Sequence, residues 1–151
     1  MRVVLQRSKN SKVTIDNKIN GEISDGLVIL VGFTNNDNEQ IIEKMIDKII
    51  NLRIFEDENE LMNLSLLDTK GSILSISQFT LYANAKKGRR PSFTDALEPK
   101  EASRLYDVFN KKLKEKDISV ETGQFQSDMK VEIYNDGPVT IILDSKELFN
   151  K

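Results

Sequence analysis

The stretch Tyr134-Asn135-Asp136-Gly137-Pro138-Val139-Thr140 lies between two strand-like runs, residues 129–134 and residues 139–143. Its Asn-Asp-Gly sequence, taken alone, predicts a hairpin turn. Pro138 lacks the N–H that a strand ladder needs and restricts the residue before it, and Gly137 lets another group approach the backbone closely. The stretch by itself favours an ordinary turn between two strands. The alternative is a backbone segment that is presented for recognition.

Two helices are predicted from apolar residues at helical spacing. One covers residues 37–51, where Asp37 and Gln40 resemble a capping box and the isoleucines form one apolar stripe. The other begins near Pro99, a favourable first residue of a helix, and carries a second apolar stripe. Both stripes indicate helices that pack on a sheet.

Strand patterns outnumber the helices. Two turns, at Lys9-Asn10 and at residues 16–18, separate the first short runs of strand character. We therefore predict one α+β domain over residues 1–151, with antiparallel or mixed sheets that curl toward a barrel and two main helices. Besides the runs that flank Gly137-Pro138, the predicted strands cover residues 3–7, 12–16, 19–23, 26–33, 72–79 and 119–122.

The absence of histidine and cysteine limits the chemistry of any active site. The 151 residues contain no His and no Cys, so the chain cannot form a Ser-His-Asp or Cys-His site, a disulfide or the common zinc sites. An enzyme of this composition must use carboxylates, Lys, Tyr, hydroxyl groups, backbone amides or groups of its substrate. We expect no cofactor and no metal, because Asp128, Glu132 and Asp136 have the alternating spacing of exposed strand positions.

Charge and hydropathy favour a cytoplasmic protein. The net charge is −2, so any contact with nucleic acid requires a local basic patch. No apolar run is long enough to span a membrane, and a strand-like pattern begins directly after Met1 without a signal peptide. We therefore expect neither a membrane nor DNA as a partner.

Polar side chains end an apolar strand at Ser77-Gln78-Phe79-Thr80. Groups at the end of a buried strand have defined positions because the core holds the strand. Considered alone, this segment is best explained as a strand terminus that happens to be polar. Together with Gly137-Pro138 it becomes a candidate site.

Several segments occur in one order along the chain, and in them the sequence resembles the D-aminoacyl-tRNA deacylases. The resemblance covers essentially the whole length. One departure is Gln126, where members of that family usually carry a small residue, and it concerns the geometry of the loop rather than the reaction. The segments are Gln6-Arg7, Arg53-Ile54-Phe55, Ser77-Gln78-Phe79-Thr80-Leu81, Gly88-Arg89-Arg90-Pro91-Ser92-Phe93 and Asn135-Asp136-Gly137-Pro138-Val139-Thr140.

The resemblance implies an enzyme that hydrolyses the ester between a D-amino acid and the 3′-terminal adenosine of tRNA. It implies a homodimer with the active site at the interface, where a cis Gly137-Pro138 pair reaches into the other subunit's pocket and excludes L-amino acids. Residues 77–80 would line that pocket, and Phe125 and Met129 would belong to the adenosine site. Glycyl-tRNA, which has no side chain to exclude, would also be cleaved.

Two catalytic assignments are compatible with these residues. In the one we favour, the backbone N–H groups of Phe79 and Thr80 stabilise the oxyanion, each by about 3 kcal/mol, and the ribose 2′-OH orients or activates water. This mechanism needs no histidine. The alternative makes the Thr80 hydroxyl a nucleophile, which requires a nearby base that the sequence does not identify.

A basic cluster in a loop is the candidate tRNA contact. Lys86, Lys87, Arg89 and Arg90 can neutralise phosphates of the acceptor end. Charge runs of this kind are more often solvated loops, but the resemblance favours contact with tRNA. The lysines in the last turns of the second helix are better explained as a solvated face.

Two other functions remain as alternatives, because a fold does not establish a function. The chain can be a tRNA-binding module without hydrolysis, or an editing domain that removes a mischarged L-amino acid. Residues 77–80 and Gly137-Pro138 favour the enzyme over the first alternative. A Gly-Pro pair that rejects L side chains argues against the second.

Overall fold

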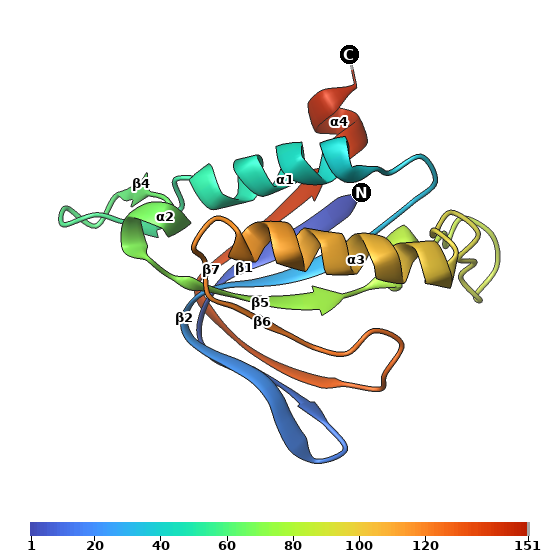
Figure 1. Ribbon diagram of the computed structural model, residues 1–151, viewed down its shortest axis with the longest axis horizontal. Helices are drawn as coiled ribbons and strands as arrows, with labels where there is room; N and C mark the ends of the chain where they lie inside the picture. The colour runs from blue at the N-terminus through green and yellow to red at the C-terminus, as the bar shows by residue number, and fades with distance from the viewer. Residues whose placement is uncertain (151) are drawn as a thin grey trace.

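One mixed five-stranded sheet, in the order β6-β5-β2-β1-β7, forms the centre of the molecule (Figure 1). The computed structural model describes residues 1–150, so residue 151 of the predicted domain lies outside the described residues. β1 pairs antiparallel with β2 and β7, whereas β5 pairs parallel with β2 and β6. The strands of this sheet are β1 (Arg2–Ile15), β2 (Lys18–Gly32), β5 (Ser72–Ser77), β6 (Val120–Thr122) and β7 (Lys130–Asp144).

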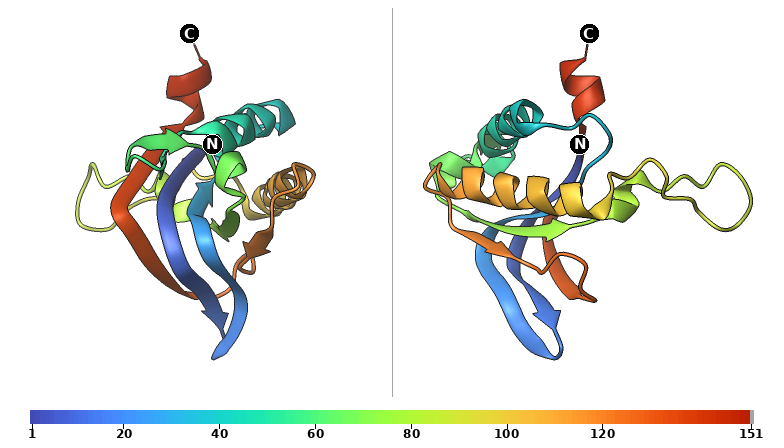
Figure 2. Two further views of the ribbon diagram at one scale, coloured as in Figure 1. Left: turned by 90° about the vertical axis from the view of Figure 1, so that its left-hand side faces the viewer. Right: turned by 45° about the vertical axis from the view of Figure 1, so that its right-hand side comes forward.

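Two long helices, α1 and α3, lie side by side over one face of the sheet (Figures 1 and 2). The predicted α+β class is confirmed, and the helix expected to begin near Pro99 begins there. A short ribbon of β3 (Phe55–Glu56) and β4 (Met62–Leu64) stands apart from the main sheet. The helices are α1 (Glu39–Asn51), α2 (Leu66–Thr69), α3 (Pro99–Lys114), α4 (Ser145–Phe149) and the 3₁₀ turn η1 (Phe79–Tyr82).

The predicted turn at Lys9-Asn10 is wrong, because β1 runs through it. β1 is paired with β2 on one side and with β7 on the other, and this pairing overrides the local turn preference. Asn10 adapts with a positive φ of 39°. The turn at residues 16–18 is confirmed, since Asp16 and Asn17 have left-handed φ values of 49° and 62°, as a two-residue hairpin turn requires.

The segment around Gly137-Pro138 is a bulge within β7 rather than a turn between two strands. The pairing of β1 with β7 shifts between Gln6 and Ser8, so residues 136–139 lie opposite Arg7 alone. β7 is an edge strand, where a proline without an N–H is tolerated. The Gly137-Pro138 peptide is cis, and both residues are exposed.

The predicted capping box at the start of α1 is also wrong. Asn38 is the N-cap, and its Oδ1 accepts a hydrogen bond from the Ile41 N–H at 3.0 Å. Asp37 instead accepts hydrogen bonds from the Thr34 N–H at 2.7 Å and from the Met1 ammonium at 2.5 Å. Tertiary contacts therefore occupy the carboxylate that the local pattern assigns to the helix.

Apolar residues pack on both faces of the sheet. The larger core lies between the sheet and the helices α1 and α3. On the opposite face, Leu74 of β5 and Val131 of β7 pack in one cluster, although their strands are three positions apart in the sheet. The sheet therefore curls, as the sequence predicts (Figure 2). Within residues 1–150, no helix is long and apolar enough to cross a membrane.

Candidate active site

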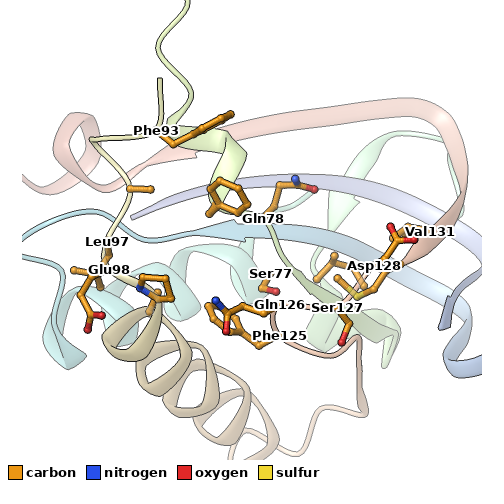
Figure 3. Close-up of a pocket in the computed structure, with 16 residues that line it drawn as sticks. Ser77, Gln78, Phe93, Leu97, Glu98, Phe125, Gln126, Ser127, Asp128 and Val131 are labelled. Carbon is orange, nitrogen blue, oxygen red and sulfur yellow. The ribbon is translucent and has the colours of Figure 1, made fainter. Parts of the chain in front are cut away.

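A cavity of about 580 Å³ opens at the carboxyl end of β5 (Figure 3). β6 pairs with β5 only as far as Ser75, and beyond that point the chain leaves β6 in the loop of residues 123–129. The cavity lies between this loop, the end of β5 and the first turn of α3. Polar and aromatic side chains in its lining include those of Ser77, Gln78, Phe79, Phe93, Phe125 and Gln126.

Three of the four predicted catalytic residues, Ser77, Gln78 and Phe79, line this cavity, whereas Thr80 does not. The Gln78 N–H donates to the Val31 carbonyl at 2.7 Å, after which the chain turns into η1. The Gln78 side-chain amide donates to the Thr80 hydroxyl oxygen. The partner of the Thr80 hydroxyl is thus an amide, which cannot act as a base.

The amides at the start of η1 have no acceptor within residues 1–150. The first N–H groups of a helix have no partner inside it, and no hydrogen bond from the Phe79 or Thr80 N–H is formed in this part of the chain. Both residues are exposed beside Ser77. Two adjacent N–H donors can stabilise a negatively charged oxygen without a side-chain acid.

Phe125 and Met129, the predicted adenosine-site residues, form another part of the cavity wall. The Phe125 ring lies 6.2 Å, between centroids, from Tyr106 of α3. The Tyr106 hydroxyl donates to the Ser75 carbonyl at 2.7 Å, and burial raises the pKa of this phenol, so it remains a donor at neutral pH. Tyr106 belongs to the apolar stripe of α3, and no local pattern in the sequence links it to the cavity.

Two further lining residues have no counterpart in the predicted site. Gln126 has a left-handed φ of 59°, a conformation that costs a non-glycine residue energy. Gln126 is the position at which the sequence departs from the small residue usual in the family. Phe93 lies at the mouth of the cavity (Figure 3) and contacts Phe79 edge to face, with 5.1 Å between ring centroids. Its position next to a basic loop was visible in the sequence, but the direction of its ring was not.

Gly137 and Pro138 do not line the cavity of their own chain. They project from β7, beside the buried guanidinium of Arg7. The Arg7 Nε donates to the Asp136 carbonyl at 3.1 Å, and its Nη1 donates to the Ile54 carbonyl at 2.8 Å. One chain by itself therefore presents the Gly-Pro bulge and the cavity as two separate features.

The predicted tRNA contact is a loop that projects from the molecule (Figure 2). Asn84 and Ser92 close its base through mutual backbone hydrogen bonds of 2.8 and 3.0 Å. All four cations of the predicted cluster, Lys86, Lys87, Arg89 and Arg90, are exposed on this loop. None of these four side chains forms a salt bridge within residues 1–150.

The sequence is similar to those of D-aminoacyl-tRNA deacylases. A family model described as D-Tyr-tRNA(Tyr) deacylase matches residues 4–144. The D-aminoacyl-tRNA deacylase of Clostridioides difficile (strain 630) is 54% identical over 149 residues, which are 99% of this chain and 100% of that protein. The D-aminoacyl-tRNA deacylase of Bacillus mycoides (strain KBAB4) is 56% identical over 146 residues, which are 97% of this chain and 100% of that protein.

Solved structures share the fold. A c-Myc DNA unwinding element binding protein superposes with a TM-score of 0.90 at 36% identity, covering 95% of this chain and 98% of that chain. A probable eukaryotic D-amino acid tRNA deacylase superposes with a TM-score of 0.80, covering 94% of this chain and 97% of that chain. At 18% identity, this second likeness concerns the fold alone.

Proposed function

Because the chain belongs to the D-Tyr-tRNA(Tyr) deacylase family and is therefore a hydrolase, we propose that it cleaves the ester between a D-amino acid and the 3′-terminal adenosine of tRNA. The observation that carries the proposal for this chain is the pair of adjacent Phe79 and Thr80 amides at the start of η1, which have no acceptor in the described residues and directly follow the cavity-lining Ser77 and Gln78. A chain without histidine and cysteine has few other means of stabilising an oxyanion.

The proposed reaction uses the backbone and the substrate. Water attacks the ester carbonyl, and the carbonyl oxygen becomes an oxyanion that accepts hydrogen bonds from the Phe79 and Thr80 N–H groups. The neighbouring ribose 2′-OH orients the water and accepts or relays its proton. The 3′-oxygen of the adenosine leaves with a proton, so that free D-amino acid and tRNA are released. Ser77 and Gln78 position the acyl group in the cavity.

Phe125 and Met129 bind the terminal adenosine in this proposal. Both present apolar surface in a wall of the cavity, and a nucleobase stacks well on such a surface. The Tyr106 hydroxyl on the Ser75 carbonyl keeps the Phe125 wall at a fixed position relative to β5. The distance between the adenosine and the amides of η1 is set in this way by α3.

The proposed enzyme is a two-fold homodimer in which Gly137 and Pro138 complete the partner's cavity. Two observations support this. The Gly-Pro bulge is exposed and lies outside the cavity of its own chain, and β7 is an edge strand with exposed apolar residues, Tyr134 at 67% and Ile142 at 68%. Sedimentation of the active enzyme tests the dimer, and a fully active monomer would contradict it.

The Gly-Pro pair selects by exclusion. Only backbone carbonyls and a rigid ring are available there, so the pair occupies the space that the Cβ of an L-amino acid needs. The corresponding space for a D side chain stays open. Glycine has hydrogen on both sides and passes the same filter, so we include glycyl-tRNA among the substrates.

The decisive experiment is incubation of the purified protein with matched D-tyrosyl- and L-tyrosyl-tRNA. We expect rapid release of D-tyrosine and survival of the L-ester. Hydrolysis of the L-ester alone would identify an editing domain for a mischarged L-amino acid. Binding of both substrates without hydrolysis would identify a tRNA-binding module instead.

A further inference from the structure

Two exposed phenylalanines meet at the mouth of the cavity. The Phe79 and Phe93 rings stand edge to face, at 68° and 5.1 Å between centroids, and both line the cavity. Phe79 is 57% exposed and Phe93 is 37% exposed. Large aromatic surfaces left open beside a cavity indicate a binding surface rather than a packing position.

The two rings lie between the reacting centre and the basic loop. Phe79 follows Gln78 and contributes an amide to the start of η1. Phe93 follows Ser92, whose hydrogen bonds with Asn84 close the base of the loop that carries the four cations. The order along the surface is therefore the amides of η1, the aromatic pair and the positive charges.

This order matches a single-stranded nucleotide chain. Its terminal nucleoside carries the ester, the preceding base has a flat apolar face, and the phosphates that follow are anionic. Aromatic side chains stack on such bases whatever the identity of the base, and nearby Lys and Arg neutralise the phosphates. The four exposed cations favour this anionic chain over a neutral surface as the ligand.

We propose that Phe93, supported by Phe79, is the stacking site for the nucleobase directly 5′ of the terminal adenosine. The proposal rests on the proposed function, because it assumes that the adenosine enters the cavity. Stacking there holds the 3′ end across the mouth, with its phosphates directed toward the loop of residues 84–92. The site reads the presence of a base, not its sequence.

The test compares two ligands that differ only in one base. One is the dinucleotide cytidylyl-(3′→5′)-adenosine, and the other is the same molecule with the cytosine replaced by hydrogen. We expect the wild-type protein to bind the complete dinucleotide about 5- to 100-fold more tightly, as stacking of one base on an aromatic ring provides. Phe93→Leu, which keeps an apolar side chain without a π face, should lose this preference. Phe93→Tyr, the matched control, should retain it.

Three outcomes would overturn the proposal. In the first, the wild-type protein binds both ligands with equal affinity. In the second, Phe93→Leu lowers the affinity for both ligands by the same factor, which would make Phe93 part of the adenosine cavity itself. In the third, Phe93→Leu changes the sedimentation of the protein, which would show that the Phe93 ring contacts a second copy of the chain. Thermal unfolding of each variant verifies that it is folded.

Failure of the stacking site and failure of the proposed function are distinguishable. Hydrolysis of D-tyrosyl-tRNA by the wild-type protein is measured in parallel. A wild-type protein that hydrolyses the ester but binds both ligands equally rejects the stacking site alone. A preserved base preference in a protein that does not hydrolyse the ester rejects the proposed reaction and leaves the stacking site in place.

Discussion

Arg7 donates a hydrogen bond from Nε to the carbonyl oxygen of Asp136 at 3.1 Å, across the gap that the β7 bulge opens in the sheet. The Arg7 side chain is buried, and its Nη1 donates to the Ile54 carbonyl at 2.8 Å. The Asp136 and Glu56 carboxylates lie at 3.5 and 3.7 Å from its nitrogens and balance its charge. One guanidinium thus connects the Gly137-Pro138 bulge to the segment that precedes β3.

Arg7→Lys should reduce discrimination between D- and L-substrates. Lysine has a single ammonium, which cannot reach two carbonyls in different directions as the guanidinium does. One buried carbonyl then loses its donor, which costs about 1–3 kcal/mol of stability and releases the bulge. The measurement is the ratio of hydrolysis rates for D- and L-tyrosyl-tRNA. Arg53→Lys is the control. It replaces an exposed guanidinium next to the β3–β4 ribbon and should leave this ratio unchanged.

Thr80→Ala should retain activity within about tenfold of the wild type, because the backbone N–H of the residue is unchanged. The Thr80 hydroxyl contacts the Gln78 amide rather than a base. Removal of a true nucleophile would instead reduce turnover by several orders of magnitude. Single-turnover hydrolysis of D-tyrosyl-tRNA distinguishes the two cases, and an inactive variant that still folds and binds tRNA would support the nucleophile.

Neutralising the basic loop should flatten the salt dependence of tRNA binding. Each phosphate contact with a single strand contributes about 0.7 to the slope of log K against log salt concentration, so replacing Lys86, Lys87, Arg89 and Arg90 with Gln should lower the slope by up to about 3. Replacing three lysines of α3 or its C-terminal end, Lys111, Lys114 and Lys116, serves as the control. An unchanged slope for the loop variant would identify a solvated loop.

Gly26→Ala should destabilise the fold by about 3 kcal/mol or more. Gly26 has a φ of 141° where β2 begins to pair with β5, and a Cβ there would overlap the carbonyl oxygen of Ser72. Gly88→Ala is the matched control, since Gly88 also has a positive φ, 67°, but no atom lies within 4 Å of its Cβ position. Its cost should be near 1 kcal/mol. Denaturant unfolding of both variants measures the difference.

Glycyl-tRNA should be hydrolysed at a rate closer to that of D-alanyl-tRNA than to that of L-alanyl-tRNA. Exclusion by Gly137 and Pro138 acts on an L side chain, and the lost contacts of a missing methyl group cost only about 1–3 kcal/mol. A time course with the three esters at equal enzyme concentration is the measurement. Survival of glycyl-tRNA for as long as L-alanyl-tRNA would mean that the cavity recognises the D side chain directly.

Elements with a strong local pattern were predictable. The apolar stripes of residues 41–50 and 102–113 predicted α1 and α3, and the Asp16-Asn17 turn was predicted from residues that tolerate left-handed φ values. The errors at Lys9-Asn10 and at residues 136–139 share one cause. Each segment has local turn chemistry, but it is held in or beside a strand whose partners lie far away in the sequence.

The candidate site, too, was predictable from the sequence only in part. The sequence alone identified Ser77, Gln78 and Phe79 at the end of an apolar strand, and Phe125 and Met129 through a family resemblance. That these two groups line one cavity depends on the early end of β6 and on the curl of the sheet. The parts played by Tyr106 and Phe93 depend on ring directions that no local pattern specifies.

The sequence by itself determined the α+β class, the two main helices and a chemistry without histidine or cysteine, because composition and apolar spacing are local properties of the chain. Only the tertiary structure decided that Gly137-Pro138 is a bulge opposite Arg7, that the amides of Phe79 and Thr80 are left without acceptors in the described chain, and that Phe79 and Phe93 meet edge to face in the cavity lining. These features arise from pairing between distant strands, and the free energy of that pairing exceeds the small local preferences of turns and caps.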